Sequence, residues 1–264
     1  MPFHLTLPAT LPQRVVAHQP LVGAWVSSGS DTAAEIIATA GFDWVLIDAE
    51  HSPYGLETVT SLLRATNGTA ATPVVRLPQG DTALIKQYLD LGAQNLMIPM
   101  VHTVEDAQRI VAAMHYPPRG VRGVGSALAR SSRWNGVKNY LANASDTISL
   151  TVQIESAQAV ENAAEIAALD GVDAVFVGPA DLAASMGLLG QPAHPDVVAA
   201  VEHTFRAVLG TGKPVGVNTF DTTQAKKYLE AGASFVCVGA DVQLLANSAR
   251  TLAATFDDHR NGAN

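Results

Sequence analysis

The chain has 264 residues, of which 48% are hydrophobic and 15% charged, and it carries a formal charge of −8 with a pI near 5.4. This length fits one large core or two small ones, and the acidic balance argues against a nucleic-acid partner, which needs a basic face. No apolar run approaches the roughly 20 residues of a membrane span, and no signal-peptide pattern is present at the amino terminus. The single cysteine, Cys237, lies in the apolar run "FVCVG" and is predicted to be buried. We therefore expect a cytoplasmic protein.

Short β-branched runs alternate with alanine-rich segments of helical period along the chain. The predicted strands are residues 22–26, 44–50, 73–77, 95–100, 149–155, 174–179, 214–218 and 235–239. The predicted helices are residues 32–40, 56–65, 82–91, 104–114, 157–169, 195–209, 222–231 and 242–256. Regular alternation of strand and helix predicts right-handed crossovers and a parallel sheet.

A weak repeat marks every second strand: "AGFDWVLID", "LGAQNLMIP", "DGVDAVFVG" and "AGASFVCVG" share a glycine followed by a short turn and an apolar strand. The glycines are predicted to end helices with a positive φ. Eight such units predict a single (β/α)8 TIM barrel over residues 1–264. An open doubly wound sheet is the alternative, but the first strand is not followed by GxGxxG. The longest insert, residues 115–136, is predicted to be a solvated loop or a subunit contact.

Polar side chains gather where the predicted strands end. The second strand ends in Asp48, Glu50 and His51, the third near Arg76, the fifth in Gln153 and Glu155, and Asp181 follows the sixth. In a barrel these ends share one rim, which is where the chemistry of such folds lies. Taken singly, each residue has a structural interpretation; Asp181, for example, could cap a helix. Taken together, they predict a site.

Glu155 and Asp181 come from adjacent strands and suit a hard divalent cation. Mg²⁺ is typically held by one or two carboxylates together with water and substrate oxygens, and Mn²⁺ or Co²⁺ could replace it. No zinc-binding spacing of His or Cys is present. The turn "VGPAD" offers backbone N–H groups from Ala180 and Asp181 that could bind a substrate carboxylate.

These groups suit the chemistry of a 2-oxo acid. A metal that contacts its ketone oxygen acts as a Lewis acid and favours an enolate, and Arg76 could stabilise the charge on the enolate oxygen. His51 could move a proton near neutral pH. Addition of this metal-bound enolate to an aldehyde is an aldol reaction. A lysine Schiff base is disfavoured, since none of the five lysines ends a predicted strand.

Several stretches are similar to one known family. "IDAEHSP", "VVRLP", "GAQNLMIPMV", "RGVRGVGSALARSSRW", "QIES" and "VFVGPADLAASMG" resemble the HpcH/HpaI aldolases, in order from about residue 23 to residue 256. The resemblance implies a class II, metal-dependent pyruvate aldolase of the 4-hydroxy-2-oxoheptanedioate or 2-keto-3-deoxy sugar-acid type. It also implies a homo-oligomer, a hexamer built from dimers that exchange the last helix.

The resemblance also implies roles for single residues. His51 is similar to the family's catalytic base and Arg76 to its transition-state stabiliser, while Glu155 and Asp181 match the metal ligands. The implied substrate contacts are Gln153, Gly178, Pro179, Ala180 and Asp181. An aspartate that raises the basicity of the histidine corresponds to Asp90, which the predicted helix places far from His51. Asp48, on the strand leading to His51, is the local candidate for the same role, and both stay open.

The sequence thus predicts an aldolase that reversibly cleaves 4-hydroxy-2-oxo acids to pyruvate, or a hydroxypyruvate-like 2-oxo acid, and an aldehyde. "GVNTFDTT" and "VGADVQ", after the last two strands, are expected to shape the aldehyde pocket. One alternative is a CoA-thioester lyase of the citrate lyase β type, which would need more room and more basic groups for its nucleotide. The other is a barrel without catalytic function, disfavoured because buried carboxylates without a metal are costly.

Overall fold

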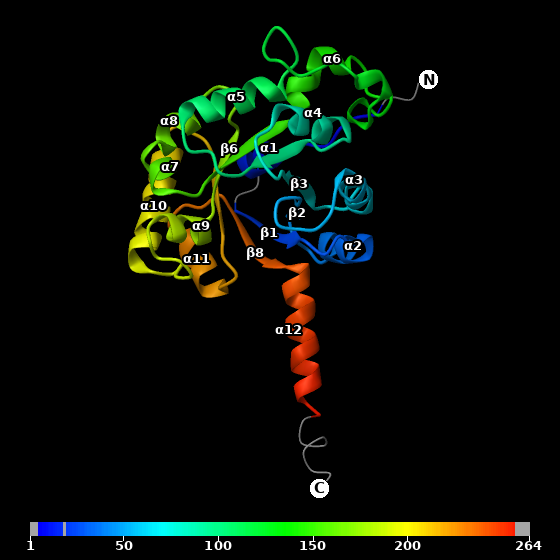
Figure 1. The fold of residues 1–264 in the computed structure, drawn as a ribbon. Helices are drawn as coiled ribbons and strands as arrows, with labels where there is room; N and C mark the ends of the chain where they lie inside the picture. The colour runs from blue at the N-terminus through cyan, green and yellow to red at the C-terminus, as the bar shows by residue number, and fades with distance from the viewer. Residues whose placement is uncertain (1–4, 18–19, 257–264) are drawn as a thin grey trace.

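The computed structural model describes residues 5–17 and 20–256, in which eight parallel strands close into a barrel (Figure 1). The strands are β1 (Leu21–Val26), β2 (Trp44–Asp48), β3 (Thr72–Arg76), β4 (Asn95–Ile98), β5 (Ser149–Ile154), β6 (Ala174–Val177), β7 (Val215–Asn218) and β8 (Phe235–Ala240). Each strand pairs with the next, and β8 pairs with β1. The predicted (β/α)8 barrel is confirmed, and the open doubly wound sheet is wrong.

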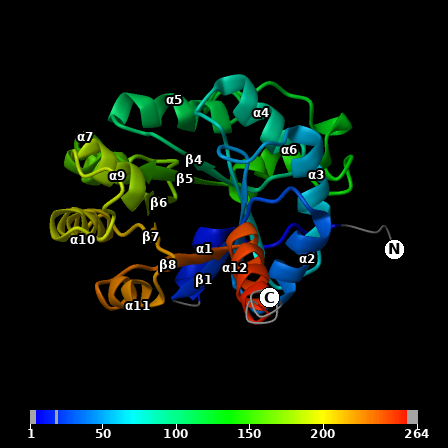
Figure 2. The same cartoon turned by 60° about the horizontal axis from the view of Figure 1, so that its bottom comes forward.

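Helices follow the strands around the outside of the barrel (Figures 1 and 2). Those near predicted positions are α2 (Asp31–Thr39), α3 (Leu56–Ala65), α4 (Thr82–Asp90), α5 (Val104–Met114), α7 (Ala157–Glu161), α8 (Ala163–Ala168), α10 (Pro195–Leu209), α11 (Thr222–Glu230) and α12 (Asp241–Ala254). The single helix predicted over residues 157–169 is wrong. It breaks at Asn162, whose side-chain amide donates to the His102 carbonyl at 2.8 Å.

Several short helices were not predicted from the sequence. They are α1 (Leu11–Ala17), α6 (Tyr140–Asn143), α9 (Pro179–Ser185) and the 3-10 helices η1 (Ser126–Leu128), η2 (Arg130–Ser132) and η3 (Ala144–Thr147). The glycine repeat, in contrast, is confirmed: Gly41, Gly92, Gly171 and Gly232 all have φ between 96° and 112°. No helix in the described part of the chain is long and apolar enough to span a bilayer.

Large and small residues interlock inside the barrel. The rings of Trp44, Phe176 and Phe235 lie 5.6–6.1 Å apart, centroid to centroid, in a buried layer that crosses the barrel axis. Glycines make room for two of them: a Cβ on Gly23 would meet the Trp44 indole at 2.4 Å, and one on Gly216 would meet the Phe235 ring at 2.4 Å. Cys237 belongs to the same buried cluster, as predicted.

Helix α1 closes the barrel at the amino-terminal ends of the strands. Leu11 and Val15 are fully buried and belong to the cluster that fills the barrel interior. The Leu11 N–H donates to Oδ1 of Asn95, the first residue of β4, at 2.8 Å. The helix therefore completes the core of the barrel.

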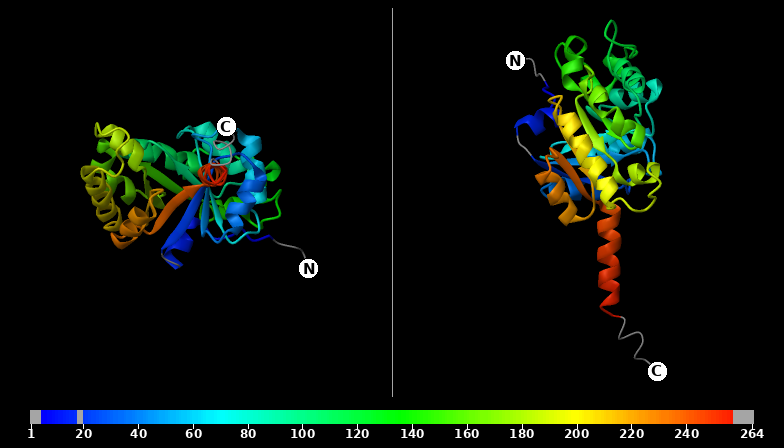
Figure 3. Two further views of the ribbon diagram at one scale, coloured as in Figure 1. Left: turned by 90° about the horizontal axis from the view of Figure 1, so that it is seen from below. Right: turned by 90° about the vertical axis from the view of Figure 1, so that its left-hand side faces the viewer.

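Helix α12 leaves the barrel instead of packing on it. Figures 1 and 3 show it extending away from the carboxyl end of β8. Asp241, its first residue, is the only one of its residues that is buried. The apolar side chains Val242, Leu244, Leu245 and Leu252 are 44–73% exposed.

Leu11→Ala is expected to lower the free energy of unfolding by about 2–5 kcal/mol, because it opens a cavity under the barrel. The measurement is urea unfolding followed by circular dichroism. Val16→Ala, on the same helix but 78% exposed, should change it by less than about 0.5 kcal/mol. Equal effects of the two variants would contradict the assignment of α1 to the core.

Candidate functional site

A pocket of about 440 Å³ opens at the carboxyl ends of the strands, on the face turned forward in Figure 2. Every residue to which the sequence assigned a role, except Asp90, lines it: Asp48, His51, Arg76, Gln153, Glu155, Gly178, Pro179, Ala180 and Asp181. Segments more than 100 residues apart in the sequence thus meet in one pocket, as the shared rim of a barrel predicts.

Arg76 is the fixed cation of this pocket. Its Nε lies 3.0 Å from Oδ1 of Asp48, its partner in the β2–β3 register, and one Nη lies 2.8 Å from Oε2 of Glu50. The guanidinium also stacks over the Trp25 indole, 4.3 Å from the ring centroid. Burial raises the pKa of the Glu50 carboxyl, and the Arg76 charge opposes that rise. Since Arg76 is 6% exposed, these contacts are what hold its charge inside the protein.

The Asp48 carboxylate also ends strand β2. Its Oδ1 accepts the backbone N–H groups of Glu50 at 3.1 Å and His51 at 3.4 Å. An aspartate that binds the backbone two residues on forms a turn, so the predicted extension of this strand to Glu50 is wrong. The turn carries Glu50 and His51 out of the sheet and over the pocket.

The His51 ring lies at the pocket rim, with 67% of the side chain exposed. Its Nε2 is 3.9 Å from Oε2 of Glu50, the carboxylate with which it forms an ion pair when protonated. Asp48 contacts His51 through the backbone N–H. The role of His51 as a base and that of Asp48 in orienting it stay predictions.

Asp90 lies elsewhere. It is the last residue of α4, and its Oδ1 accepts a hydrogen bond from the fully buried Arg122 at 2.8 Å. Arg122 belongs to the insert predicted as a solvated loop or a subunit contact; this arginine is not solvated, because it packs against Tyr116 and pairs with Asp90 of α4. An effect of Asp90 on His51 would therefore have to come from another subunit.

Glu155, directly after β5, is the most strongly perturbed acid of the pocket. It is 3% exposed; Oε1 accepts from Nε2 of Gln153 at 2.9 Å and Oε2 from the backbone N–H of Met100 at 3.0 Å. Burial, with a smaller contribution from the negative charges of Asp181 and Glu50, raises the pKa of its carboxyl to about 7. A cation bound near Glu155 would stabilise the deprotonated, negatively charged form of its carboxyl group.

Asp181 faces the same pocket from the first turn of α9. Gly178 is the N-cap residue of this short helix, and Pro179 occupies its first turn, so Asp181 does not cap the helix. The strand predicted to run to Pro179 ends at Val177 for the same reason. Asp181 and Ala180 are exposed, which leaves the Asp181 carboxylate free of the constraints that fix Glu155.

The oxygen atoms beside Glu155 fit a hard divalent cation. Oε1 of Gln153 is buried without a hydrogen-bond partner. Gly178 leaves room beside the carboxylate, since a Cβ there would lie 2.3 Å from Oε1 of Glu155. In the described residues no three or more His, Cys, Asp or Glu side chains gather as metal ligands. A cation bound by Glu155 and Asp181 would therefore take its other ligands from Gln153, water or substrate, as Mg²⁺ commonly does.

Some pocket residues had no role in the sequence prediction. Trp25 lies under Arg76, and its Nε1 donates to Oδ1 of Asn218 at 2.7 Å. Phe176 also contributes to the pocket lining. Asn218 and Phe220, which lie in the stretch expected to shape the aldehyde pocket, do line the cavity. Strand alternation could have found Trp25, which points to the same side of β1 as Gly23.

Comparison with known proteins matches residues 21–248 to the family described as HpcH/HpaI aldolase/citrate lyase. A hydroxypyruvate/pyruvate aldolase of Deinococcus radiodurans is 52% identical over 249 residues, covering 94% of this chain and 90% of that protein. A 4-hydroxy-2-oxo-heptane-1,7-dioate aldolase of Salmonella heidelberg is 49% identical over 240 residues, 91% of each chain. The crystal structure of an HpcH/HpaI aldolase/citrate lyase family protein from Burkholderia cenocepacia superposes with a TM-score of 0.89 at 41% identity, covering 94% of this chain and 98% of that one.

A closed barrel with buried acids and a fixed arginine at its carboxyl end is the architecture of a (β/α)8-barrel enzyme. The chain belongs to the HpcH/HpaI aldolase/citrate lyase family. The resemblance found in the sequence motifs is confirmed.

Glu155→Gln is expected to raise the free energy of unfolding of the metal-free protein at pH 8 by on the order of 2 kcal/mol, and by much less at pH 5. With a pKa of about 7 instead of 4.5, the folded protein binds this proton more tightly than the unfolded chain does. Stability contributed by the protonated acid is therefore lost as the pH rises from about 4.5 to about 7.

Urea unfolding in the presence of a chelator, at both pH values, measures the effect. Glu161→Gln, an exposed acid on α7, serves as the matched control and should show no such difference. A destabilised Glu155→Gln protein at pH 8 would contradict the burial argument.

Proposed function

We propose that this protein is a carbon–carbon lyase, a class II aldolase that reversibly cleaves 4-hydroxy-2-oxo acids to pyruvate, or a hydroxypyruvate-like 2-oxo acid, and an aldehyde. The proposal rests on one observation. The buried oxygens of Gln153 and Glu155 and the ion-paired guanidinium of Arg76 lie in the same pocket. The printed names of relatives about half identical in sequence support it.

Glu155, Asp181 and Gln153 are the residues proposed to hold a divalent ion, Mg²⁺, Mn²⁺ or Co²⁺. Such an ion, when bound, supplies Lewis-acid polarisation of the 2-oxo group. The backbone N–H groups of Ala180 and Asp181 are proposed to bind the substrate carboxylate beside it. Gly178 and Pro179 shape this wall, because a larger residue at Gly178 would collide with Glu155.

Arg76 is proposed to stabilise the charge that develops during cleavage. As the C3–C4 bond breaks, its electron pair passes into the 2-oxo acid and an enolate oxygen forms. Asp48, Glu50 and Trp25 hold the guanidinium on three sides, so it need not reorganise when that charge appears.

His51 is proposed to move the proton. Cleavage removes the proton from the 4-hydroxyl group, giving the aldehyde, and the enolate later takes a proton at C3. An exposed imidazole can do both, directly or through water. Glu50, 3.9 Å away, can pair with the ring while it carries the proton.

A CoA-thioester lyase of the citrate lyase β type is not favoured. The family name covers both activities, but the relatives at 47–52% identity are named as aldolases. The pocket, about 440 Å³, also contains Arg76 as its single basic residue besides His51.

Pyruvate release from 4-hydroxy-2-oxo-heptane-1,7-dioate, followed with lactate dehydrogenase, tests the activity. Activity is expected with Mg²⁺, Mn²⁺ or Co²⁺ and should be lost in excess EDTA, because the oxygens beside Glu155 need a cation. Full activity in the chelator would contradict the proposal.

In the same assay Arg76→Gln should lower kcat by about 10²–10³-fold, since one fixed donor to the developing oxyanion is lost. Arg109→Gln removes an exposed arginine paired with Asp106 on α5 and should stay within about twofold of the wild type.

We also propose that the protein is a homo-oligomer in which α12 packs on another subunit, within a hexamer built as a trimer of dimers. Support comes from the apolar stripe of Val242, Leu245 and Leu252, whose spacing puts all three on one helix face. A solvent-exposed stripe of this kind on a helix that leaves its own barrel is typical of a subunit contact.

Leu245→Glu/Leu252→Glu is expected to give a smaller assembly, because it places two charges in the proposed contact. Size-exclusion chromatography with light scattering measures the mass. Asn247→Glu adds a charge at an exposed polar position on the opposite face of the same helix and is the control. An unchanged mass for the double variant would overturn this proposal.

A further inference from the structure

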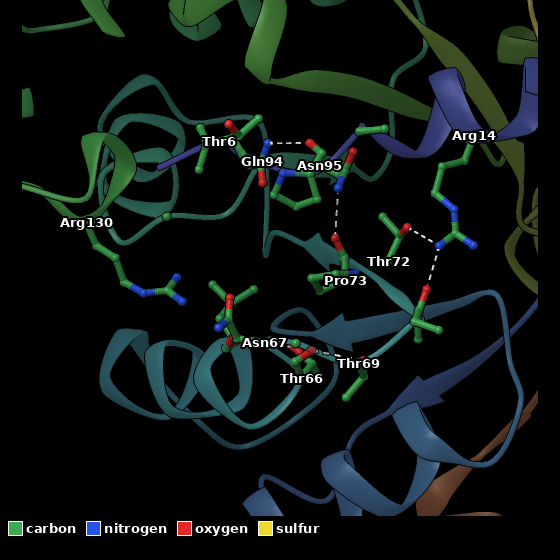
Figure 4. Close-up of a pocket in the computed structure, with 18 of the residues that line it drawn as sticks. Thr6, Arg14, Thr66, Asn67, Thr69, Thr72, Pro73, Gln94, Asn95 and Arg130 are labelled. Atoms are coloured by element: carbon green, nitrogen blue, oxygen red, sulfur yellow. Dashed lines mark hydrogen bonds between the residues drawn. The ribbon is translucent and has the colours of Figure 1, made fainter. Parts of the chain in front are cut away.

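A second cavity, of about 550 Å³, lies at the other end of the barrel (Figure 4). Its walls come from the end of α3, the starts of β3 and β4, residues 6–9, α1 and the η2 region. Strand β3 begins in this wall with Thr72 and ends in the catalytic pocket with Arg76. No residue of the catalytic pocket lines the second cavity.

The charge of this cavity is uncompensated. Arg14, Arg130 and Arg133 line it, and no Asp or Glu of the part of the chain that the structure describes does so. Among the described residues none of these arginines forms an ion pair with a carboxylate. Exposed arginines are often surrounded only by solvent, but these three are half-buried. They form a positively charged cavity in a protein whose net charge is −8.

Arg130 and Arg133 converge on one point. Their Nη1 atoms lie 2.6 and 3.0 Å from where a Cβ on Gly92 would be. Each Nη1 donates only to a backbone carbonyl, that of Leu91 at 3.2 Å and that of Arg130 at 2.6 Å. Each guanidinium has five N–H donors, so most remain available. Burial, together with repulsion from Arg133 and Arg64, lowers the pKa of Arg130 to about 10, and a bound anion would relieve this cost.

Arg14 lies on the opposite side of the cavity from Arg130 (Figure 4). Its Nη1 donates to the Asp43 carbonyl at 2.7 Å, the Ala70 carbonyl at 2.9 Å and the Thr72 hydroxyl at 2.5 Å, which fixes the side chain and leaves its other N–H groups available. Asn67, exposed at the end of α3, also lines the cavity. The cavity therefore has cationic groups at two sides.

We propose that this cavity is a second binding site, which takes a small organic anion with oxyanion groups at both ends, such as a dicarboxylate or a phosphorylated carboxylate. Arginine recognises both carboxylate and phosphate through parallel N–H donors. The volume lies in the range of about 300–1,000 Å³ that is usual for small-molecule sites. The opposed arginines favour an extended anion over a compact one.

Isothermal titration calorimetry of the full-length, chelated protein at low salt tests the site, with succinate and 3-phosphoglycerate as separate probes. Saturable binding of at least one probe is expected, and which one binds distinguishes the two anion classes. Arg130→Gln/Arg133→Gln should weaken it at least about tenfold, since charged hydrogen bonds are lost. Arg109→Gln/Arg119→Gln removes the same charge from exposed, carboxylate-paired positions and should stay within about twofold.

Three further variants locate the anion. Asn67→Asp puts a negative charge at the rim of the cavity and should also weaken binding, whereas Asn67→Ala should do so much less; this side chain is exposed, so folding is preserved. Arg76→Gln should leave binding unchanged, because Arg76 lies in the catalytic pocket.

The proposal is overturned if neither probe binds, if binding survives both Arg130→Gln/Arg133→Gln and Asn67→Asp, or if Arg76→Gln abolishes it. A smaller assembly of the Arg130→Gln/Arg133→Gln protein, with no anion binding to the wild type, would assign these arginines to a subunit contact instead. Pyruvate release is a separate assay, so the failure of one proposal leaves the other standing.

Discussion

The catalytic face is organised around the buried positive charge of Arg76. A guanidinium that is 6% exposed needs partners to replace water, and it finds Asp48, Glu50 and the Trp25 ring. These partners come from β1, β2 and the turn after β2, and Trp25 is itself held by Asn218 of β7. The position of one cation thus depends on β1, β2, β3 and β7, and on the closure of the barrel through β8, which lies between β7 and β1.

The opposite wall of the pocket has the reverse polarity. Glu155 and Asp181 repel each other, which raises the pKa of the Glu155 carboxyl, and Gln153 turns an unpartnered amide oxygen toward the same region. An arginine on one wall and crowded oxygens on the other make a pocket that orients a polar, anionic molecule between them. The oxygen-lined wall is not satisfied by protein contacts alone, since Oε1 of Gln153 has no hydrogen-bond partner.

Much of the fold and of the catalytic pocket could be predicted from the sequence, because the patterns that mark strands, helices and strand ends are local or periodic. The glycine repeat located every second strand, and the ends of the apolar runs supplied all but one of the predicted pocket residues. Asp90 is the exception, because its place came from the resemblance alone.

Contacts between distant segments could not be predicted from the sequence. These are the stacking of Arg76 on Trp25, the burial of Arg122 against α4, and the closure of the barrel by Leu11. The helical period of residues 242–256 was recognised, but a helix that packs on its own barrel and one that packs on a neighbour have the same period.

The interlocked rings of Trp44, Phe176 and Phe235 block diffusion of solutes through the interior of the barrel. With Leu11 and Val15 beneath them, they leave no passage along the barrel axis, so no solute can diffuse from one mouth to the other. The second cavity and the catalytic pocket are nevertheless joined through the sheet. Strand β3 begins with Thr72 in the wall of the second cavity and ends with Arg76 in the catalytic pocket.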